Sequence, residues 1–155
     1  MNRWLSLALF VLAAFSAAAL GGWATGSGVS TWYLTLNKPA WNPPGWIFGP
    51  VWTVLYAVMA VAAWRVWLVR AQPGAGLVLR VWFAQLALNA LWSLLFFGLR
   101  SPGAALVEIV IFWAVLLWLQ LRLPRYDRFA ALLWAPYLAW VSFASFLNFT
   151  IWRLN

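Results

Sequence analysis

The sequence predicts an all-α membrane protein, a bundle of five transmembrane helices with a long structured first loop. Two observations support this fold class. The 155-residue chain is 66% hydrophobic and 8% charged, whereas soluble domains are about 45–50% apolar and about 25% charged. Its apolar residues also gather in five runs of about 20 residues, the length that crosses a bilayer as a helix. A water-soluble domain is excluded, because too few polar residues remain to cover its surface.

Turn and charge signals separate these five runs. Residues 72–74, 100–103 and 122–128 combine proline with glycine or arginine and end successive runs. The first run follows a basic residue, as a signal peptide does, but it is longer than the apolar part of a signal peptide and is interpreted as a retained helix. The chain is therefore predicted to form one domain, residues 1–155, with spans at Trp4–Trp23, Trp46–Leu68, Gly76–Phe97, Gly103–Leu121 and Phe129–Ile151.

The ten basic residues are distributed unequally between the two sides that this topology creates. Cytoplasmic segments of bacterial membrane proteins carry the excess of lysine and arginine. We therefore expect a cytoplasmic N-terminus in the inner membrane, with an outer-membrane location as the alternative. Because topology accounts for the basic charge, no nucleic-acid partner is expected. The N-terminal side holds Arg3, Arg65, Arg70, Arg80, Arg122, Arg125 and Arg128, and the other side holds Lys38, Arg100 and Arg153.

The residues that the chain lacks limit its chemistry. It has no histidine and no cysteine, so no Ser-His-Asp triad, thiolate nucleophile or Cys/His metal site is expected. No catalytic residue is assigned. The two acids are Glu108 and Asp127. Glu108 lies in the fourth span and should pair with an amide or arginine, lie near the interface or be protonated. Asp127 should form a solvated ion pair with Arg125 or Arg128.

The loop between the first two spans, residues 25–46, is rich in aromatic residues and proline. Pro43-Pro44 fixes the backbone where the second helix begins, and so fixes the direction of Trp41 and Trp46. One interpretation is a belt of aromatic residues at the membrane interface. The other is a rigid lid over a ligand site in the bundle.

Several residues recur at helical spacing. Trp52 and Tyr56 are four apart, and Trp140, Ala144 and Leu147 form a second stripe, so each set shares a helix face. Such faces serve either a ligand site or helix packing. A polar line at 85, 89 and 93 should face the bundle interior. The small residues at 14, 18, 22 and 26, and those at 84, 87 and 90, are two candidate helix–helix or dimer interfaces.

The motifs together resemble the tryptophan-rich sensory protein and translocator family, TspO/MBR. The resemblance covers essentially the whole chain. It rests on five segments in the family's order: Trp32-Tyr33 with Asn37-Lys38-Pro39-Ala40-Trp41-Asn42-Pro43-Pro44; Leu88-Asn89-Ala90-Leu91-Trp92 with Phe96-Phe97-Gly98; Ala105-Leu106-Val107-Glu108; Pro136-Tyr137-Leu138-Ala139-Trp140; and Leu147-Asn148-Phe149.

The resemblance implies a homodimeric receptor or sensor in the lipid membrane. It would bind porphyrins (protoporphyrin or haem, with no covalent cofactor) and similar planar hydrophobic ligands in a pocket closed by the first loop. The alternatives are a transporter of such ligands and a light-dependent porphyrin-degrading enzyme. The implied ligand-binding residues are Tyr33, Trp41, Trp52, Tyr56, Asn89, Trp92, Trp140, Ala144 and Leu147.

Overall fold

The computed structural model describes residues 1–155 and contains five long helices and no strands. This confirms the predicted all-α membrane fold. All five helices are long and apolar enough to cross a membrane, because 24 residues of α-helix span about 36 Å and the hydrocarbon layer about 30 Å. The helices are α1 (Arg3–Gly26), α2 (Phe48–Leu68), α3 (Ala75–Ser93), α4 (Pro102–Arg122) and α5 (Arg128–Leu154).

Short helical turns lengthen or connect these helices. The first loop contains η1 (Trp32–Thr35) and η2 (Gly45–Ile47), and η2 leads directly into α2. A π-helical turn, η3 (Leu94–Gly98), continues α3, and η4 (Leu123–Arg125) continues α4. With these turns included, the helices begin and end within four residues of the predicted spans.

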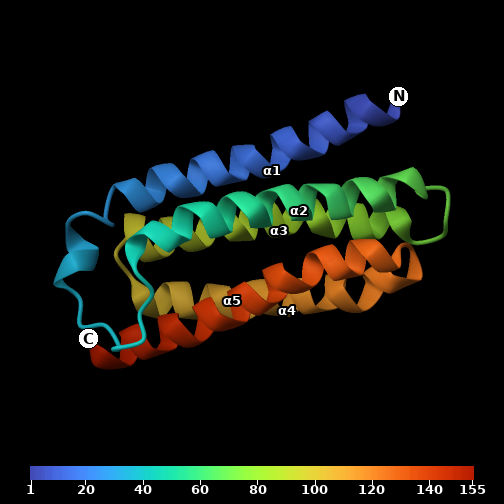
Figure 1. Ribbon diagram of the computed structural model, residues 1–155. Helices are drawn as coiled ribbons and strands as arrows, with labels where there is room; N and C mark the ends of the chain where they lie inside the picture. Colours follow the sequence, from blue (N-terminus) through green and yellow to red (C-terminus); the bar gives the residue numbers. More distant parts are fainter.

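The helices form a closed ring. Helix α1 packs against α2 and α3, α4 packs against α3 and α5, and α2 packs against α5. Figure 1 shows the first loop, the C-terminus and the α3–α4 connection at one end of the bundle, while the N-terminus and the other two connections lie at the opposite end. We call these the loop end and the N-terminal end.

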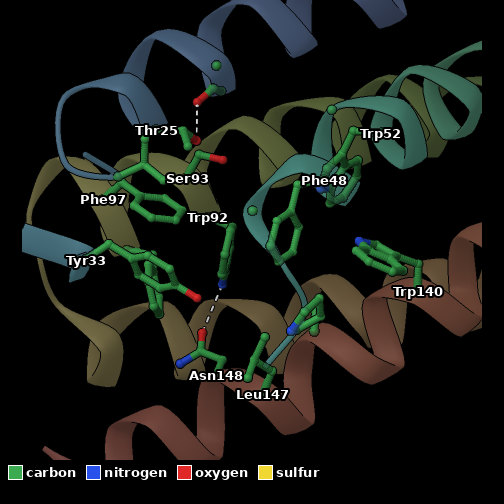
Figure 2. A pocket seen from close by; sticks show the side chains of 18 of the residues that line it. Thr25, Tyr33, Phe48, Trp52, Trp92, Ser93, Phe97, Trp140, Leu147 and Asn148 are labelled. Atoms are coloured by element: carbon green, nitrogen blue, oxygen red, sulfur yellow. Dashed lines mark hydrogen bonds between the residues drawn. The ribbon is translucent and has the colours of Figure 1, made fainter. Parts of the chain in front are cut away.

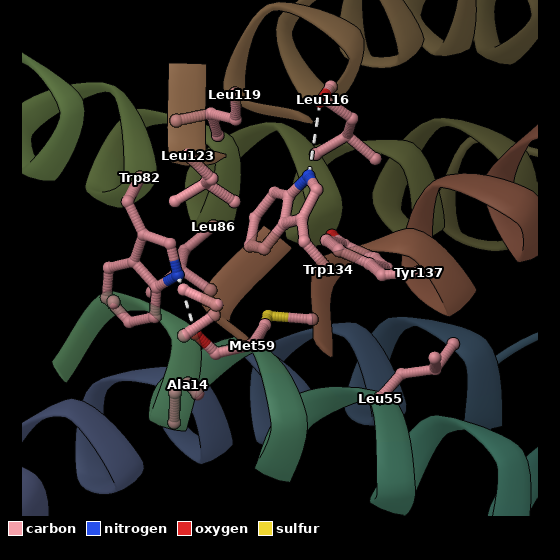
Figure 3. Packing of buried hydrophobic residues seen from close by; sticks show 14 of the residues in the cluster. Ala14, Leu55, Met59, Trp82, Leu86, Leu116, Leu119, Leu123, Trp134 and Tyr137 are labelled. Atoms are coloured by element: carbon pink, nitrogen blue, oxygen red, sulfur yellow. Dashed lines mark hydrogen bonds between the residues drawn. The ribbon is translucent and has the colours of Figure 1, made fainter. Parts of the chain in front are cut away.

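Two buried indoles tie neighbouring helices together in the core (Figure 3). Trp82 on α3 donates its indole N–H to the Met59 carbonyl on α2 at 3.0 Å, and Trp134 on α5 donates to the Leu116 carbonyl on α4 at 3.1 Å. These two large aromatic side chains fill the interior without leaving their N–H groups unpaired. This core occupies the N-terminal half of the ring and leaves the loop end for the cavity described below.

One ion pair connects α2 to the start of α5. The Arg65 guanidinium donates from Nε and Nη2 to the two carboxylate oxygens of Asp127, at 2.9 and 2.7 Å. Asp127 also accepts from the Ala130 N–H at 2.7 Å and so caps α5. The predicted pairing of Asp127 with Arg125 or Arg128 is therefore wrong: folding brings Arg65 within reach, and its fork of donors matches both oxygens.

Asp127 should stabilise the fold through its charge and its cap separately. Asp127→Asn keeps a capping oxygen but loses the ion pair, so we expect a loss of about 1 kcal/mol or less. Asp127→Ala loses the cap as well, at a further cost of about 1 kcal/mol. Thermal unfolding in detergent, followed by circular dichroism, would measure both. Equal stability of the two variants would contradict the capping role.

The stabilisation that Asp127 provides should depend on pH. The Arg65 guanidinium and the Ala130 N–H hold the pKa of the Asp127 carboxyl below its ordinary value. A lowered folded-state pKa means that the stabilisation is present at neutral pH and is lost as the pH falls through that pKa. The difference between wild type and Asp127→Asn should therefore shrink on acidification. A difference that stays constant down to low pH would contradict the prediction.

Single cysteines can test the two-ended topology because the chain contains none. Ser30 at the loop end and Gln72 in the α2–α3 connection are both exposed. Gly74 is a poor choice, since its φ is 86° and an added Cβ would lie 2.6 Å from the Tyr126 hydroxyl. Ser30→Cys and Gln72→Cys should react with an impermeant thiol reagent from opposite sides of the membrane. Labelling of both from one side would contradict five spans.

Candidate ligand-binding site

A cavity of about 950 Å³ lies at the loop end of the bundle. Helices α1, α2, α3, α4 and α5 and the first loop all contribute to its wall. Its volume is near the upper end of the range for pockets that bind small molecules. Figure 2 shows aromatic side chains facing this space from several helices, with Phe48 and Trp52 on α2, Trp92 on α3 and Trp140 on α5.

The structure brings eight of the nine predicted site residues together around this cavity. They are Tyr33, Trp52, Tyr56, Asn89, Trp92, Trp140, Ala144 and Leu147. Trp41 is absent from the wall. Its ring instead stacks on the exposed Phe146 of α5 at 5.4 Å between centroids and meets Phe143, a residue of the cavity wall, edge-on at 5.9 Å. Trp41 therefore attaches the loop to α5 from outside the cavity.

A chain of buried hydrogen bonds forms one side of the cavity and continues into the core. The Tyr56 hydroxyl donates to Asn89 Oδ1 at 2.5 Å, and Asn89 Nδ2 donates to the Tyr137 hydroxyl at 2.8 Å. Tyr137 donates in turn to Gln85 Oε1 at 2.8 Å. These bonds confirm that the polar line on α3 faces the bundle interior. They join α2, α3 and α5, so Asn89 is held in place before any ligand arrives.

Two tryptophans on the wall differ in their polar contacts. The Trp92 N–H donates to Asn148 Oδ1 at 3.0 Å, and Asn148 donates to the Pro102 carbonyl at 2.9 Å. The Trp140 N–H has no hydrogen-bond partner, although it is buried. Its ring packs edge-to-face against Phe48, with centroids 5.9 Å apart. The Trp140 ring lines the cavity, but its unpaired N–H is covered by neighbouring atoms, and buried donors of this kind are rare.

The first loop is held by hydrogen bonds within itself and by the last residue of the chain. The Tyr33 hydroxyl donates to Asn42 Oδ1 at 3.0 Å. Asn155 Oδ1 accepts from the Asn37 backbone N–H, and Asn155 Nδ2 donates to the Asn37 carbonyl, both at 2.9 Å. The Asn155 side-chain amide thus pairs with both backbone groups of Asn37, as the backbone of a neighbouring β-strand would. Gly28 lets the loop approach η3, because an added Cβ would lie 2.7 Å from the Phe97 carbonyl oxygen.

The cavity opens on the side of α1, the loop and the start of α2. All wall residues from α3, η3, α4 and α5 are buried or half-buried, whereas eight from the other segments are exposed. Four of those eight are glycines, so half of the rim residues have no side chain. The exposed set is Gly22, Gly26, Val29, Leu34, Pro44, Gly45, Gly49 and Thr53.

The sequence interpretation missed the contribution of α1. Its small residues were expected to pack against another helix. Ala14 does pack in the core, but Ala18, Gly22 and Gly26 line the cavity. Small residues leave room next to a helix, and the same spacing serves a neighbouring helix or an empty space equally well. On α3, Ala84 and Ala87 are exposed on the outside of the bundle.

The two acids do not contribute to the cavity wall. Glu108 is 6% exposed on α4, and neither carboxyl oxygen has a hydrogen-bond partner. Of the three alternatives expected for Glu108, pairing with an amide or arginine is therefore wrong. Nowhere in the structure do three or more histidine, cysteine, aspartate or glutamate side chains gather where they could hold a metal ion.

The ring of five membrane-spanning helices around a cavity lined with aromatic side chains defines a multi-pass membrane protein with an interior cavity. Comparison with known proteins identifies the family. The TspO/MBR family model matches residues 9–153, and the chain belongs to this family. Tryptophan-rich protein TspO of Chlorobaculum tepidum is 45% identical over 156 residues, covering 97% of this chain and 96% of its own length.

An archaeal and a human protein are also similar to this chain. Tryptophan-rich protein TspO of Archaeoglobus fulgidus is 39% identical over 97% of each chain. The translocator protein of Homo sapiens is 39% identical over 126 residues, which are 80% of this chain and 75% of its own length. The tryptophan-rich sensory protein of Cereibacter sphaeroides is 44% identical over 128 residues, which are 80% of this chain and 77% of its own length. The chain is thus similar to proteins named as a sensory protein and as translocator proteins.

The bonds between Asn155 and Asn37 predict that α5 restrains the loop. Asn155→Ala should raise the hydrogen-exchange rate of loop amides, above all that of Asn37, because two hydrogen bonds to its backbone are lost. Arg153→Ala is the matched control, since Arg153 lies in the same turn and makes no hydrogen bond to the loop. Hydrogen–deuterium exchange with mass spectrometry would measure this. Equal exchange in both variants would contradict the restraint.

Proposed function

We propose that this protein is a membrane receptor or sensor that binds porphyrins and similar planar hydrophobic ligands in the cavity. The observation that carries the proposal is the aromatic wall of a cavity of about 950 Å³. Rings from α2, α3 and α5 face the same space, and aromatic side chains favour stacked or edge-on contacts with flat rings. Asn89, which hydrogen bonds hold in place on the cavity wall, would orient the ligand.

The membrane and the assembly are part of the same proposal. Seven arginines belong to the N-terminal end of the bundle, which we assign to the cytoplasm of a bacterial inner membrane. Ser30→Cys should then react from outside. For a homodimer, the exposed small residues of α3, including Ala84 and Ala87, are the better candidate face, because those of α1 pack inside or line the cavity.

Titration of the purified protein with protoporphyrin tests the proposal directly. Saturable quenching of tryptophan fluorescence in darkness, with no change in the porphyrin spectrum, is expected for a receptor. New absorbance bands that appear only in light would favour the porphyrin-degrading enzyme. Porphyrin movement into sealed vesicles containing the protein would favour the transporter. Absence of saturable binding in darkness and in light would exclude the proposal.

Trp140 provides a residue-level prediction. Trp140→Ala removes an aromatic contact worth about 0.5–1.5 kcal/mol beyond its area, so porphyrin should bind at least several-fold more weakly. Trp46→Ala is the matched control, because Trp46 is 73% exposed and does not line the cavity. Fluorescence titration in darkness measures both affinities. Equal affinities in two folded variants would remove Trp140 from the site.

A further inference from the structure

The wall of the cavity carries one charge. Lys38, from the first loop, is the only charged residue among those that line the cavity. It is also the only lysine in the chain, since the other nine basic residues are arginines. Aromatic, aliphatic and uncharged polar side chains make up the rest of the wall.

The loop backbone fixes the position of this ammonium group. Lys38 Nζ donates to the Tyr33 carbonyl at 2.9 Å and to the Leu36 carbonyl at 3.0 Å, and lies 4.9 Å from the centre of the Tyr33 ring. An ammonium group has three protons, so these two hydrogen bonds leave one for another acceptor. Neither carbonyl carries a net charge.

No acid in the protein neutralises Lys38. The chain has two acids, and the single ion pair is that of Arg65 with Asp127 at the N-terminal end. Glu108 belongs to α4, lies outside the cavity wall and makes no hydrogen bond. A half-buried cation without a counter-ion attracts an anion more strongly than an exposed one, because water screens it less.

The groups next to Lys38 are also polar, whereas most of the remaining wall is apolar. The Tyr33 hydroxyl and the Asn42 amide line the cavity on the same loop as Lys38. The remaining wall is mainly apolar, with Phe15 and Ala18 on α1, and Ile109 and Phe112 on α4. The cavity therefore has a cationic, polar loop side and an apolar, aromatic interior.

We propose that Lys38 binds a carboxylate of the ligand and so selects planar amphiphiles with an acidic edge over neutral molecules of the same shape. This inference rests on the proposed function and adds the chemical class of ligand. The carboxylate would accept the free Nζ proton and supply the missing counter-charge. The flat apolar body would lie among the rings of α2 and α5.

A matched pair of ligands separates charge from shape. Protoporphyrin IX carries two carboxylates, and its dimethyl ester has the same ring system without them. Affinities for both would be measured in darkness, by fluorescence quenching, with wild type and Lys38→Met in nanodiscs of neutral lipid. The quantity of interest is the ratio of the ester Kd to the acid Kd. Differences in how the two probes partition into lipid cancel when this ratio is compared between variants.

We expect a ratio of about ten in wild type, since a charge-assisted hydrogen bond contributes that order of affinity, and a ratio near one in Lys38→Met. Lys38→Arg retains the charge and should keep a clear preference for the acid. High salt should lower the wild-type ratio. If Lys38→Met only disturbs the loop, both ligands weaken equally and the ratio stays at the wild-type value.

The outcomes distinguish this inference from the proposed function. A ratio unchanged in Lys38→Met, or lost equally in Lys38→Arg, would overturn the role of the Lys38 charge while leaving porphyrin binding intact. A wild-type ratio near one would overturn it as well. Failure of both probes to bind the wild-type protein would instead overturn the proposed function.

Discussion

The hydrogen-bond chain from Tyr56 through Asn89 and Tyr137 to Gln85 determines how three helices are arranged around the cavity. In lipid, helices gain little from burying apolar surface against one another, and buried polar groups have no water to bind. Each bond contributes modestly, about 0.6 kcal/mol on average in membrane proteins. Together they fix the rotation of α2, α3 and α5, because a turned helix would leave an amide or hydroxyl unpaired.

The two halves of the bundle are built differently as a result. The N-terminal half is closely packed around Met59, Trp82 and Trp134, whose indoles donate to backbone carbonyls. The loop half contains the cavity, and contacts at both ends of α5 hold the surrounding segments in place. Helix α5 is tied to α2 by Asp127 at one end and to the loop by Asn155 at the other. These contacts fix the segments around the cavity, so no ligand is needed to keep the cavity open.

The fold could be predicted almost completely from the sequence, because span length and charge signals depend on neighbouring residues alone. Most of the cavity wall could be predicted as well, since Trp52 with Tyr56 and Trp140 with Ala144 follow helical spacing. The position of Trp41 outside the cavity could not be predicted, because a loop has no periodicity that sets the direction of a side chain. The partner of Asp127 could not be predicted, because Arg65 is 62 residues away. The wall formed by α1 was missed because small residues indicate packing and empty space equally.

The pairing of Asn155 with Asn37 also links the loop to the way helices come apart. The carbonyl groups in the final turn of a helix have no N–H partners within the helix, and this turn frays at little cost in free energy. Asn155 Nδ2 also donates to the Ile151 carbonyl at 2.8 Å, so the residue that holds the loop also caps the end of α5. Fraying of that end would release both contacts at once. The loop therefore shares its local stability with the least stable turn of α5, and warming should loosen the two together, well below the temperature at which the bundle unfolds.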